Sequence, residues 1–202
     1  MRRLTLSTAL AVLLLLAAAV SAFAHRPYFE EDDIRAGKPW VIDNPTISTV
    51  IYATLQNPCD VDYYAFDGRA GQSILLELTI PQISGQEDFA PNLALMGPGL
   101  PATKLPARVA RPAKTGGLLL PPPPGPAETF FEPFSRTSYW ERQSQRVTLP
   151  QDGRYVVAVW HPDRQLGRYG FVIGDREVPG GDLAFSRKLR SYWTPVPSPA
   201  TP

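Results

Sequence analysis

Apolar and polar residues alternate along several short segments of this chain, which is typical of β-strands with one face in a core. The clearest segment is 73–80, where Ile74, Leu76, Leu78 and Ile80 fall on one face and mostly polar residues fall on the other. The segment 154–161 is apolar on both faces, which predicts a central strand buried on both sides.

Other strands are predicted at short intervals over 38–43, 46–55, 60–67, 92–96, 145–149 and 167–174. One short basic helix is predicted within 182–193. Asp152-Gly153 before Tyr155 at a strand start is the arrangement of a tyrosine corner, which locks a Greek-key crossover. We therefore predict an all-β fold, an antiparallel Greek-key or jelly-roll-like β-sandwich over 39–178.

Proline changes this picture in two places, because the chain has 23 prolines among its 202 residues. A long proline-rich insertion occupies 97–127, and its four consecutive prolines at 121–124 favour polyproline II over a ladder strand. We expect no regular element between 100 and 127. After the short basic helix, we expect the proline-rich end of 179–202 to be disordered.

The N-terminal segment 1–24 is predicted to be a signal peptide. It has Arg2-Arg3, an apolar run over 9–20 and an Ala22-x-Ala24 cleavage pattern. The run is too short for a membrane anchor, which needs about 20 apolar residues. We expect an exported protein, periplasmic or extracellular, that begins at His25 with an extended acidic lead-in over 25–38 and has no membrane span after cleavage.

The net charge and the cysteine content argue against a nucleic-acid-binding protein and exclude an intrachain disulfide. Without the two leader arginines, 18 basic residues (20 − 2) face 19 acidic ones, a net charge of −1. This balance argues against nucleic acid as a partner, since phosphate binding needs a clustered cationic excess. The single Cys59 cannot close an intrachain disulfide, so it is either a loop thiol or half of an intermolecular bond.

Several segments together resemble the bacterial pre-peptidase C-terminal domain. They are Tyr52-x-x-Leu55, the run DVDYYAF over 60–66, the alternating strand over 74–78, and the segments 152–159 and 167–174. The resemblance covers about 47–174, and the long insertion departs from it. It implies a jelly-roll-like module of an exported bacterial protein; such modules usually do no chemistry, and some bind calcium, polymers or other proteins.

Asp60 and Asp62 are candidate calcium ligands, because alternate residues of a strand point to the same side. If the acidic lead-in folded back, further carboxylates could come from Glu30, Glu31, Asp32, Asp33 or Asp43. The alternative is that Asp60 caps a turn and Asp62 accepts ordinary hydrogen bonds.

His25 and His161 are candidate copper ligands. Cleavage after Ala24 would place His25 at the amino terminus, where its amine and imidazole could form a histidine brace with His161. The alternative is that His25 lies on a flexible lead-in and His161 lies in a turn before Pro162.

The aromatic residues Phe131, Tyr139, Trp140 and Trp160, with Phe130 and Phe134 nearby, could form a surface that binds sugar or docks a protein. The alternative is that most of them belong to the core.

No motif of nucleophilic, metal-hydrolytic or phosphate-binding chemistry occurs, so no catalytic residue is predicted. We expect a non-enzymatic accessory or binding module of the bacterial envelope or medium, with an envelope protein or polysaccharide as partner. The alternatives are a copper-binding protein and a carbohydrate-binding module; the ligand and the oligomeric state stay open.

Overall fold

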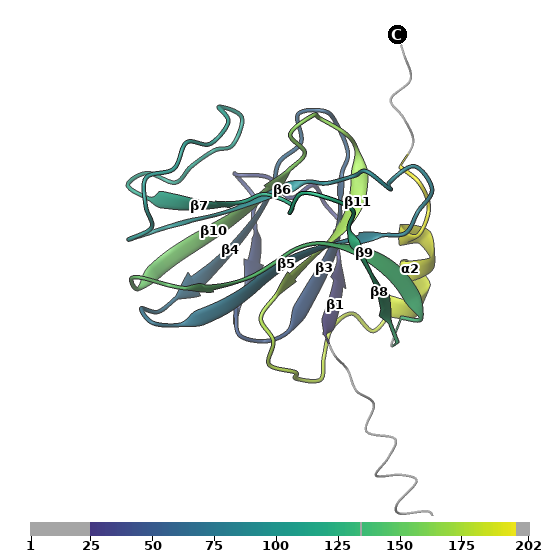
Figure 1. Ribbon diagram of the computed structural model, residues 1–202. Coiled ribbons are helices and arrows are strands. Elements are labelled where there is room, and N and C mark those ends of the chain that lie inside the picture. The colour runs from purple at the N-terminus through teal and green to yellow at the C-terminus, as the bar shows by residue number, and fades with distance from the viewer. Residues whose placement is uncertain (1–24, 134, 197–202) are drawn as a thin grey trace, which may run out of the picture.

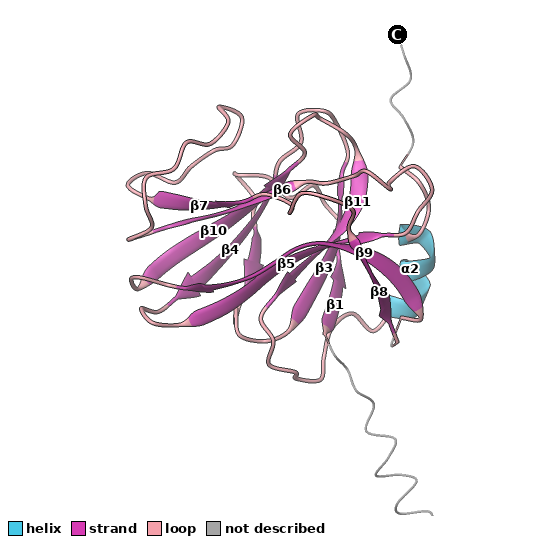
Figure 2. Cartoon of the chain, in the orientation of Figure 1, coloured by secondary structure: helices cyan, strands magenta, loops and turns pink. Residues whose placement is uncertain are grey.

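The structure is a computed structural model that describes residues 25–133 and 135–196, and two β-sheets packed face to face make up most of it (Figure 1). The six-stranded sheet has the order β1 (Arg26–Phe29), β3 (Thr49–Leu55), β11 (Gly167–Ile173), β5 (Ser73–Pro81), β9 (Thr137–Thr148), β8 (Glu128–Glu132). The five-stranded sheet has the order β2 (Trp40–Ile42), β4 (Asp62–Gly68), β10 (Gly153–Trp160), β6 (Asn92–Gly97), β7 (Gly116–Leu120). One helix, α2 (Phe185–Tyr192), follows the last strand (Figure 2). The predicted all-β sandwich is confirmed.

The core lies between the sheets and is formed by the alternation that the sequence shows. Ile74, Leu76, Leu78 and Ile80 of β5 are each at most 1% exposed. β10 lies between β4 and β6, and its residues 157–160 are buried on both faces, as predicted for a central strand. Aliphatic and aromatic side chains from both sheets fill the space between them, which supplies the main stabilisation of a protein without a disulfide.

The two edge strands at one side of the sandwich differ from the predicted antiparallel pairing. β1 pairs in parallel with β3, and β2 pairs in parallel with β4. The chain leaves β1 in one sheet, crosses the open side of the sandwich through residues 30–39 and enters β2 in the other sheet. No hairpin joins these strands to their neighbours, so nothing imposes antiparallel pairing there. The lead-in over 25–38, expected to be extended, therefore begins with a strand and belongs to the sandwich.

Both outer faces of the sandwich are covered. Phe185 and Leu189 of α2 pack on Val50 and Val172 of the six-stranded sheet. Val109 of the proline-rich insertion packs on Ala94, Met96 and other residues of the five-stranded sheet. The insertion is thus a cover for its own domain.

One prediction about the insertion is wrong, because β7 lies within the stretch where no regular element was expected. Residues 116–120 pair in antiparallel register with β6, and the hydrogen-bonded pairing ends where the proline run 121–124 begins. Proline lacks the N–H that a ladder requires, so the strand cannot continue.

The tyrosine corner forms as the sequence indicates. The Tyr155 hydroxyl donates to the carbonyl oxygens of Gln151 at 2.7 Å and Pro98 at 3.2 Å. Gly97 makes room for the ring, since a Cβ there would lie 2.1 Å from it. These contacts join the end of β6 to the start of β10.

The described residues leave some predictions untested. The proposed signal peptide 1–24 and the end of the tail, 197–202, lie outside them, and so does Phe134. Within 25–133 and 135–196, no helix is long and apolar enough to cross a membrane. Cys59 is exposed and carries a free thiol.

Candidate metal centre

Asp62 is a carboxylate buried between the two sheets. It is the first residue of β4, and it shares the inward-facing side with Tyr64 and Phe66, all three being 0% exposed. Its Oδ2 accepts a hydrogen bond of 2.6 Å from the Tyr169 hydroxyl, which lies 2.7 Å from the Tyr64 hydroxyl. Its Oδ1 has no hydrogen-bond partner. A buried polar atom without a partner is costly, so Asp62 lacks one interaction that its burial requires.

The lead-in brings two further carboxylates to Asp62. β1 ends at Phe29, and the next residue, Glu30, continues the ladder by donating its N–H to the Tyr52 carbonyl at 2.9 Å. The side chain of Glu30 is fixed because Oε2 accepts the Thr54 N–H at 2.9 Å and Oε1 accepts the Ile34 N–H at 3.3 Å.

Asp33 lies at the outer end of the same loop and is exposed to solvent, with the Arg35 guanidinium 3.9 Å away. The neighbouring Ile34 is 2% exposed and anchors this loop in the core. One carboxylate oxygen from each of Glu30, Asp33 and Asp62 lies within 4.8 Å of the others. Among residues 25–133 and 135–196, no other group of three or more metal-ligating side chains converges in this way.

Glu30, Asp33 and Asp62 form a carboxylate cluster, in which the surroundings of Glu30 and Asp62 oppose the ionisation of these two groups. Burial, with the nearby Glu30 charge as the next cause, raises the pKa of Asp62 well above its ordinary value. Burial likewise raises the pKa of Glu30 to about 7. A positive ion among these oxygens would remove the repulsion and favour the charged forms.

The donor set fits a hard cation. All three groups offer oxygen, and the cluster contains no imidazole or thiol, so a metal that prefers nitrogen or sulfur is disfavoured. Two ligands come from an irregular loop and one from a strand. Calcium accepts such irregular geometry, takes 6–8 oxygens at about 2.3–2.6 Å and uses bidentate carboxylates and water, whereas magnesium demands a near-ideal octahedron.

Asp60, predicted as the partner of Asp62, lies outside this group. Asp60 lies two residues before Asp62, the first residue of β4, so the alternation of the strand does not extend to Asp60. Its Oδ2 accepts the Gln56 N–H at 2.6 Å, and its own N–H donates to the Asn57 carbonyl, as expected of a residue that closes a turn. The lead-in does fold back, as calcium binding would require, and it supplies Glu30 and Asp33.

The structure does not bring His25 and His161 together. His25 Nδ1 lies 2.5 Å from the Ser48 hydroxyl, next to the residue at which β3 begins. His161 stacks on Phe89, whose ring touches Gly167, and Gly167 pairs with Leu55 at the other end of β3. The seven residues of β3, at about 3.3 Å each, separate the two histidines by roughly 20 Å.

His161 also has little capacity left to bind a metal. It is 4% exposed, and Nδ1 faces the N–H groups of Asp163 at 3.2 Å and Gln165 at 3.3 Å. The histidine brace is therefore not formed in this fold.

The predicted aromatic surface is not formed either. Trp160 is 1% exposed and Tyr139 is 3% exposed, so both are core residues, and Trp140 is half-buried against the core. Only Phe131, at 56% exposure, lies on the surface among the four predicted ligand-binding residues. Trp160 also belongs to the sheet opposite to that of the other three, so the set shares no face.

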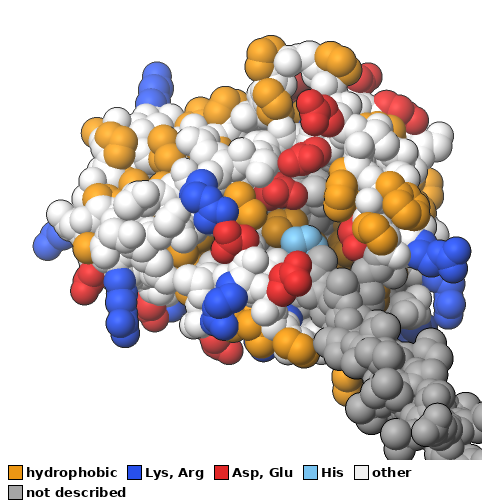
Figure 3. Space-filling model, turned by 60° about the horizontal axis from the view of Figure 1, so that its bottom comes forward, with side chains coloured by type: hydrophobic (Ala, Val, Ile, Leu, Met, Phe, Trp, Pro, Cys, Tyr) orange, Lys and Arg blue, Asp and Glu red, His pale blue; other side chains and the backbone are white. Residues whose placement is uncertain are grey.

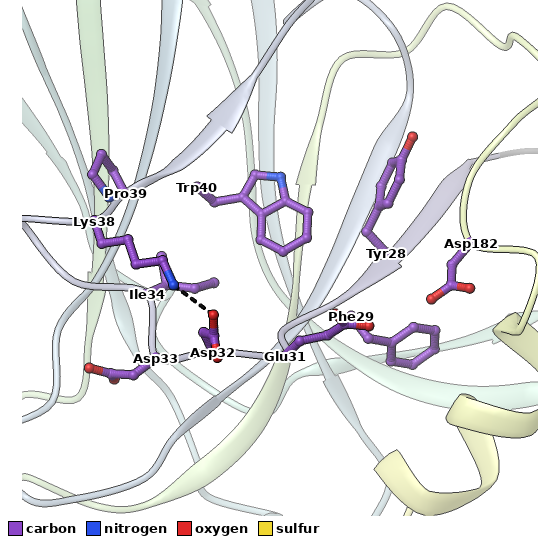
Figure 4. Close-up of a pocket in the computed structure, with 10 residues that line it drawn as sticks. All are labelled: Tyr28, Phe29, Glu31, Asp32, Asp33, Ile34, Lys38, Pro39, Trp40 and Asp182. Carbon is purple, nitrogen blue, oxygen red and sulfur yellow. Dashed lines mark hydrogen bonds and ion pairs between the residues drawn. The ribbon is translucent and has the colours of Figure 1, made fainter.

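A hollow that the sequence analysis did not identify lies beside the carboxylate cluster. It has a volume of about 450 Å³ and opens between β1 and β2, with Asp33 in its lining. Figure 4 shows the Trp40 indole between Lys38 and Tyr28, with Asp32 reaching Lys38. On the face shown in Figure 3, acidic side chains gather among hydrophobic ones. Sequence alternation could not reveal this hollow, because it depends on how the lead-in crosses between the sheets.

Comparisons with known proteins concern the fold. No family model and no curated protein matches this chain. A solved pre-peptidase C-terminal domain of collagenase from Bacillus anthracis is 12% identical, with 69% of this chain and 97% of that chain covered and a TM-score of 0.37. Two periplasmic inhibitors of g-type lysozyme, both called PliG, also match. The protein from Aeromonas hydrophila is 11% identical (73% and 97% covered, TM-score 0.36), and that from Salmonella Typhimurium is 16% identical (74% and 97%, TM-score 0.35). The matched structures thus include a pre-peptidase C-terminal domain, the kind of domain that the sequence resembles.

Proposed function

We propose that this chain is an exported, non-enzymatic binding module in which a calcium ion fixes the N-terminal lead-in across the open side of the sandwich. Glu30, Asp33 and Asp62 hold the ion. The observation that carries the proposal is that Asp62 has a buried Oδ1 without a hydrogen-bond partner and lies within reach of two other carboxylates. A divalent cation supplies both the missing partner and the missing charge.

The position of the cluster explains what the ion does. Glu30 and Asp33 belong to the lead-in, whereas Asp62 belongs to β4 in the opposite sheet from β1. An ion bound to all three residues therefore links the two sheets at the side of the sandwich where no hairpin joins β1 or β2 to its neighbouring strand. Without it, the repelling carboxylates weaken the attachment of the lead-in.

The burial of Asp62 also supports a structural rather than a catalytic role. A catalytic carboxylate must reach substrate, but Asp62 is 0% exposed and shares its Oδ2 with the buried Tyr169 hydroxyl. Asp33 is the solvent-facing member of the cluster, which gives an ion a route of entry.

Isothermal titration of the purified protein with calcium chloride tests the proposal. We expect one calcium ion per chain, with binding abolished in Asp62→Asn. Asp67→Asn is the matched control, because Asp67 lies on the same strand but its side chain is 78% exposed and pairs with Arg154. The control should bind as the unmodified chain does. If the unmodified chain binds no calcium, or if Asp62→Asn binds it equally well, the proposal is wrong and the carboxylates share protons instead.

A further inference from the structure

We infer that the hollow between β1 and β2 binds the ammonium or guanidinium group of a basic side chain presented by a partner polypeptide. This inference rests on the proposed role as a binding module and names the chemistry of its ligand. It draws on an aromatic pair and an acidic rim, and this rim shares Asp33 with the ion site.

The aromatic pair is Tyr28 of β1 and Trp40 of β2. Their ring centroids lie 6.0 Å apart at an interplanar angle of 55°, and both rings are half-buried. The pair stands between two hollows of about 450 and 280 Å³, both of which it lines. The rings are therefore held by the sandwich edge but still accessible to a ligand. Tryptophan and tyrosine faces attract cations by about 0.5–2 kcal/mol, more when the contact is shielded from water.

The rim of the larger hollow is acidic. Glu31, Asp32, Asp33 and Asp182 line it together with a single cationic side chain, that of Lys38. Aromatic faces combined with carboxylates complement an organic cation, whereas an anionic ligand would be repelled.

The protein already places ammonium groups against these carboxylates. The Lys38 ammonium lies 2.6 Å from Asp32 (Figure 4). Lys188 of α2 lies 2.5 Å from Glu31 and 2.6 Å from Asp182. A ligand cation would displace or join these lysines, so Lys38 acts as an internal competitor. Removing its charge should strengthen ligand binding, an effect that a purely structural role of the hollow would not produce.

The test uses the indole N–H signals of the four tryptophans in a two-dimensional NMR titration. The probes are N-acetyl-arginine methylamide and its neutral counterpart, N-acetyl-citrulline methylamide. Trp40→Phe assigns the Trp40 signal. We expect the arginine probe to shift this signal with saturation, and the citrulline probe to bind at least tenfold more weakly. Equal binding of the two probes, or no shift with either, would overturn the inference.

Two matched variants extend the test without disturbing the core. Lys38→Met should bind the arginine probe at least threefold more tightly. Lys104→Met, which removes the same charge from an exposed position outside the lining of the hollow, should bind it as the unmodified chain does. No change, or weaker binding, in Lys38→Met would contradict the assigned role of the acidic rim.

Repeating the titration in calcium and in chelator separates this inference from the proposed function. If calcium binds but the arginine probe does not, the inference fails and the ion site stands. If the arginine probe binds but calcium does not, the ion site fails and the hollow stands. A Trp40 shift with N-acetylglucosamine but not with the arginine probe would identify a neutral sugar site and refute the inference.

Discussion

The substitution Asp62→Asn should raise the stability of the protein in chelator and should leave it less stable than the unmodified chain in calcium. In chelator, Asp62 carries a buried oxygen without a partner, and burial raises its pKa well above the ordinary value. Asn has the same shape and keeps an oxygen near Tyr169, and its amide can donate to the facing carboxylates. Since an unpartnered buried group costs about 1–3 kcal/mol, the variant should be more stable than the unmodified chain by roughly that amount at a pH where Asp62 is ionised.

In calcium the order should invert. A ligand that binds only the folded protein stabilises it by about 4.1 kcal/mol when its concentration is about 1,000 times the dissociation constant, which exceeds the advantage of the variant. The unmodified chain gains this amount, whereas Asp62→Asn lacks the ligand atom and gains none. For a domain of this size, 1 kcal/mol corresponds to roughly 2–4 °C in melting temperature.

Urea unfolding monitored by tryptophan fluorescence, in chelator and in calcium, measures both free energies of unfolding. Asp67→Asn should stay within about 0.5 kcal/mol of the unmodified chain in both conditions, as a surface substitution does. The reasoning is refuted if Asp62→Asn is the less stable protein in chelator, or if calcium stabilises it as much as it stabilises the unmodified chain.

Three further predictions follow from the fold. Tyr155→Phe should lower the free energy of unfolding by about 1–2 kcal/mol, because it removes the hydrogen bonds to Gln151 and Pro98; an unchanged urea midpoint would contradict this. Burial lowers the pKa of His161 below 6.5, so the unfolded chain takes up a proton at a higher pH than the folded chain does. The contribution of His161 to stability is therefore lost as the pH falls below 6.5. An NMR titration midpoint of 6.5 or above for His161 would be inconsistent with this. In thermal unfolding, Trp160→Ala should lower the free energy of unfolding by about 3–5 kcal/mol, because Trp160 is a core residue, and Phe131→Ser should lower it by less than about 0.5 kcal/mol, because Phe131 lies on the surface. Similar losses for both variants would show that these two placements are wrong.

Much of the sandwich could be predicted because alternation reports directly which face of a strand is buried. The strands predicted over 73–80 and 154–161 are observed as β5 and β10 for this reason. β1 was not predicted, since its four residues show too little alternation and the acidic residues after it resemble a linker. β7 was not predicted because the prolines that follow Leu120 led us to expect no strand anywhere in this stretch, although the five residues before them form one.

The proposed ion site could be predicted only in part. The parity of the DVDYYAF segment places Asp62 on the same side as Tyr64 and Phe66, and that side faces the core. The same parity argument wrongly adds Asp60, because the strand begins at Asp62 and the backbone turns before it. The choice of Glu30 and Asp33 from a run of four acidic residues depends on the crossing between the sheets, which no local pattern encodes.

The central claim is that Glu30, Asp33 and Asp62 hold one calcium ion, and a crystal structure of the protein grown in calcium tests it most directly. Anomalous diffraction at long wavelength locates calcium without reference to any assumed site. The account predicts one peak with oxygens of all three residues within about 2.3–2.6 Å. An ordered carboxylate cluster with no peak among its oxygens would contradict it.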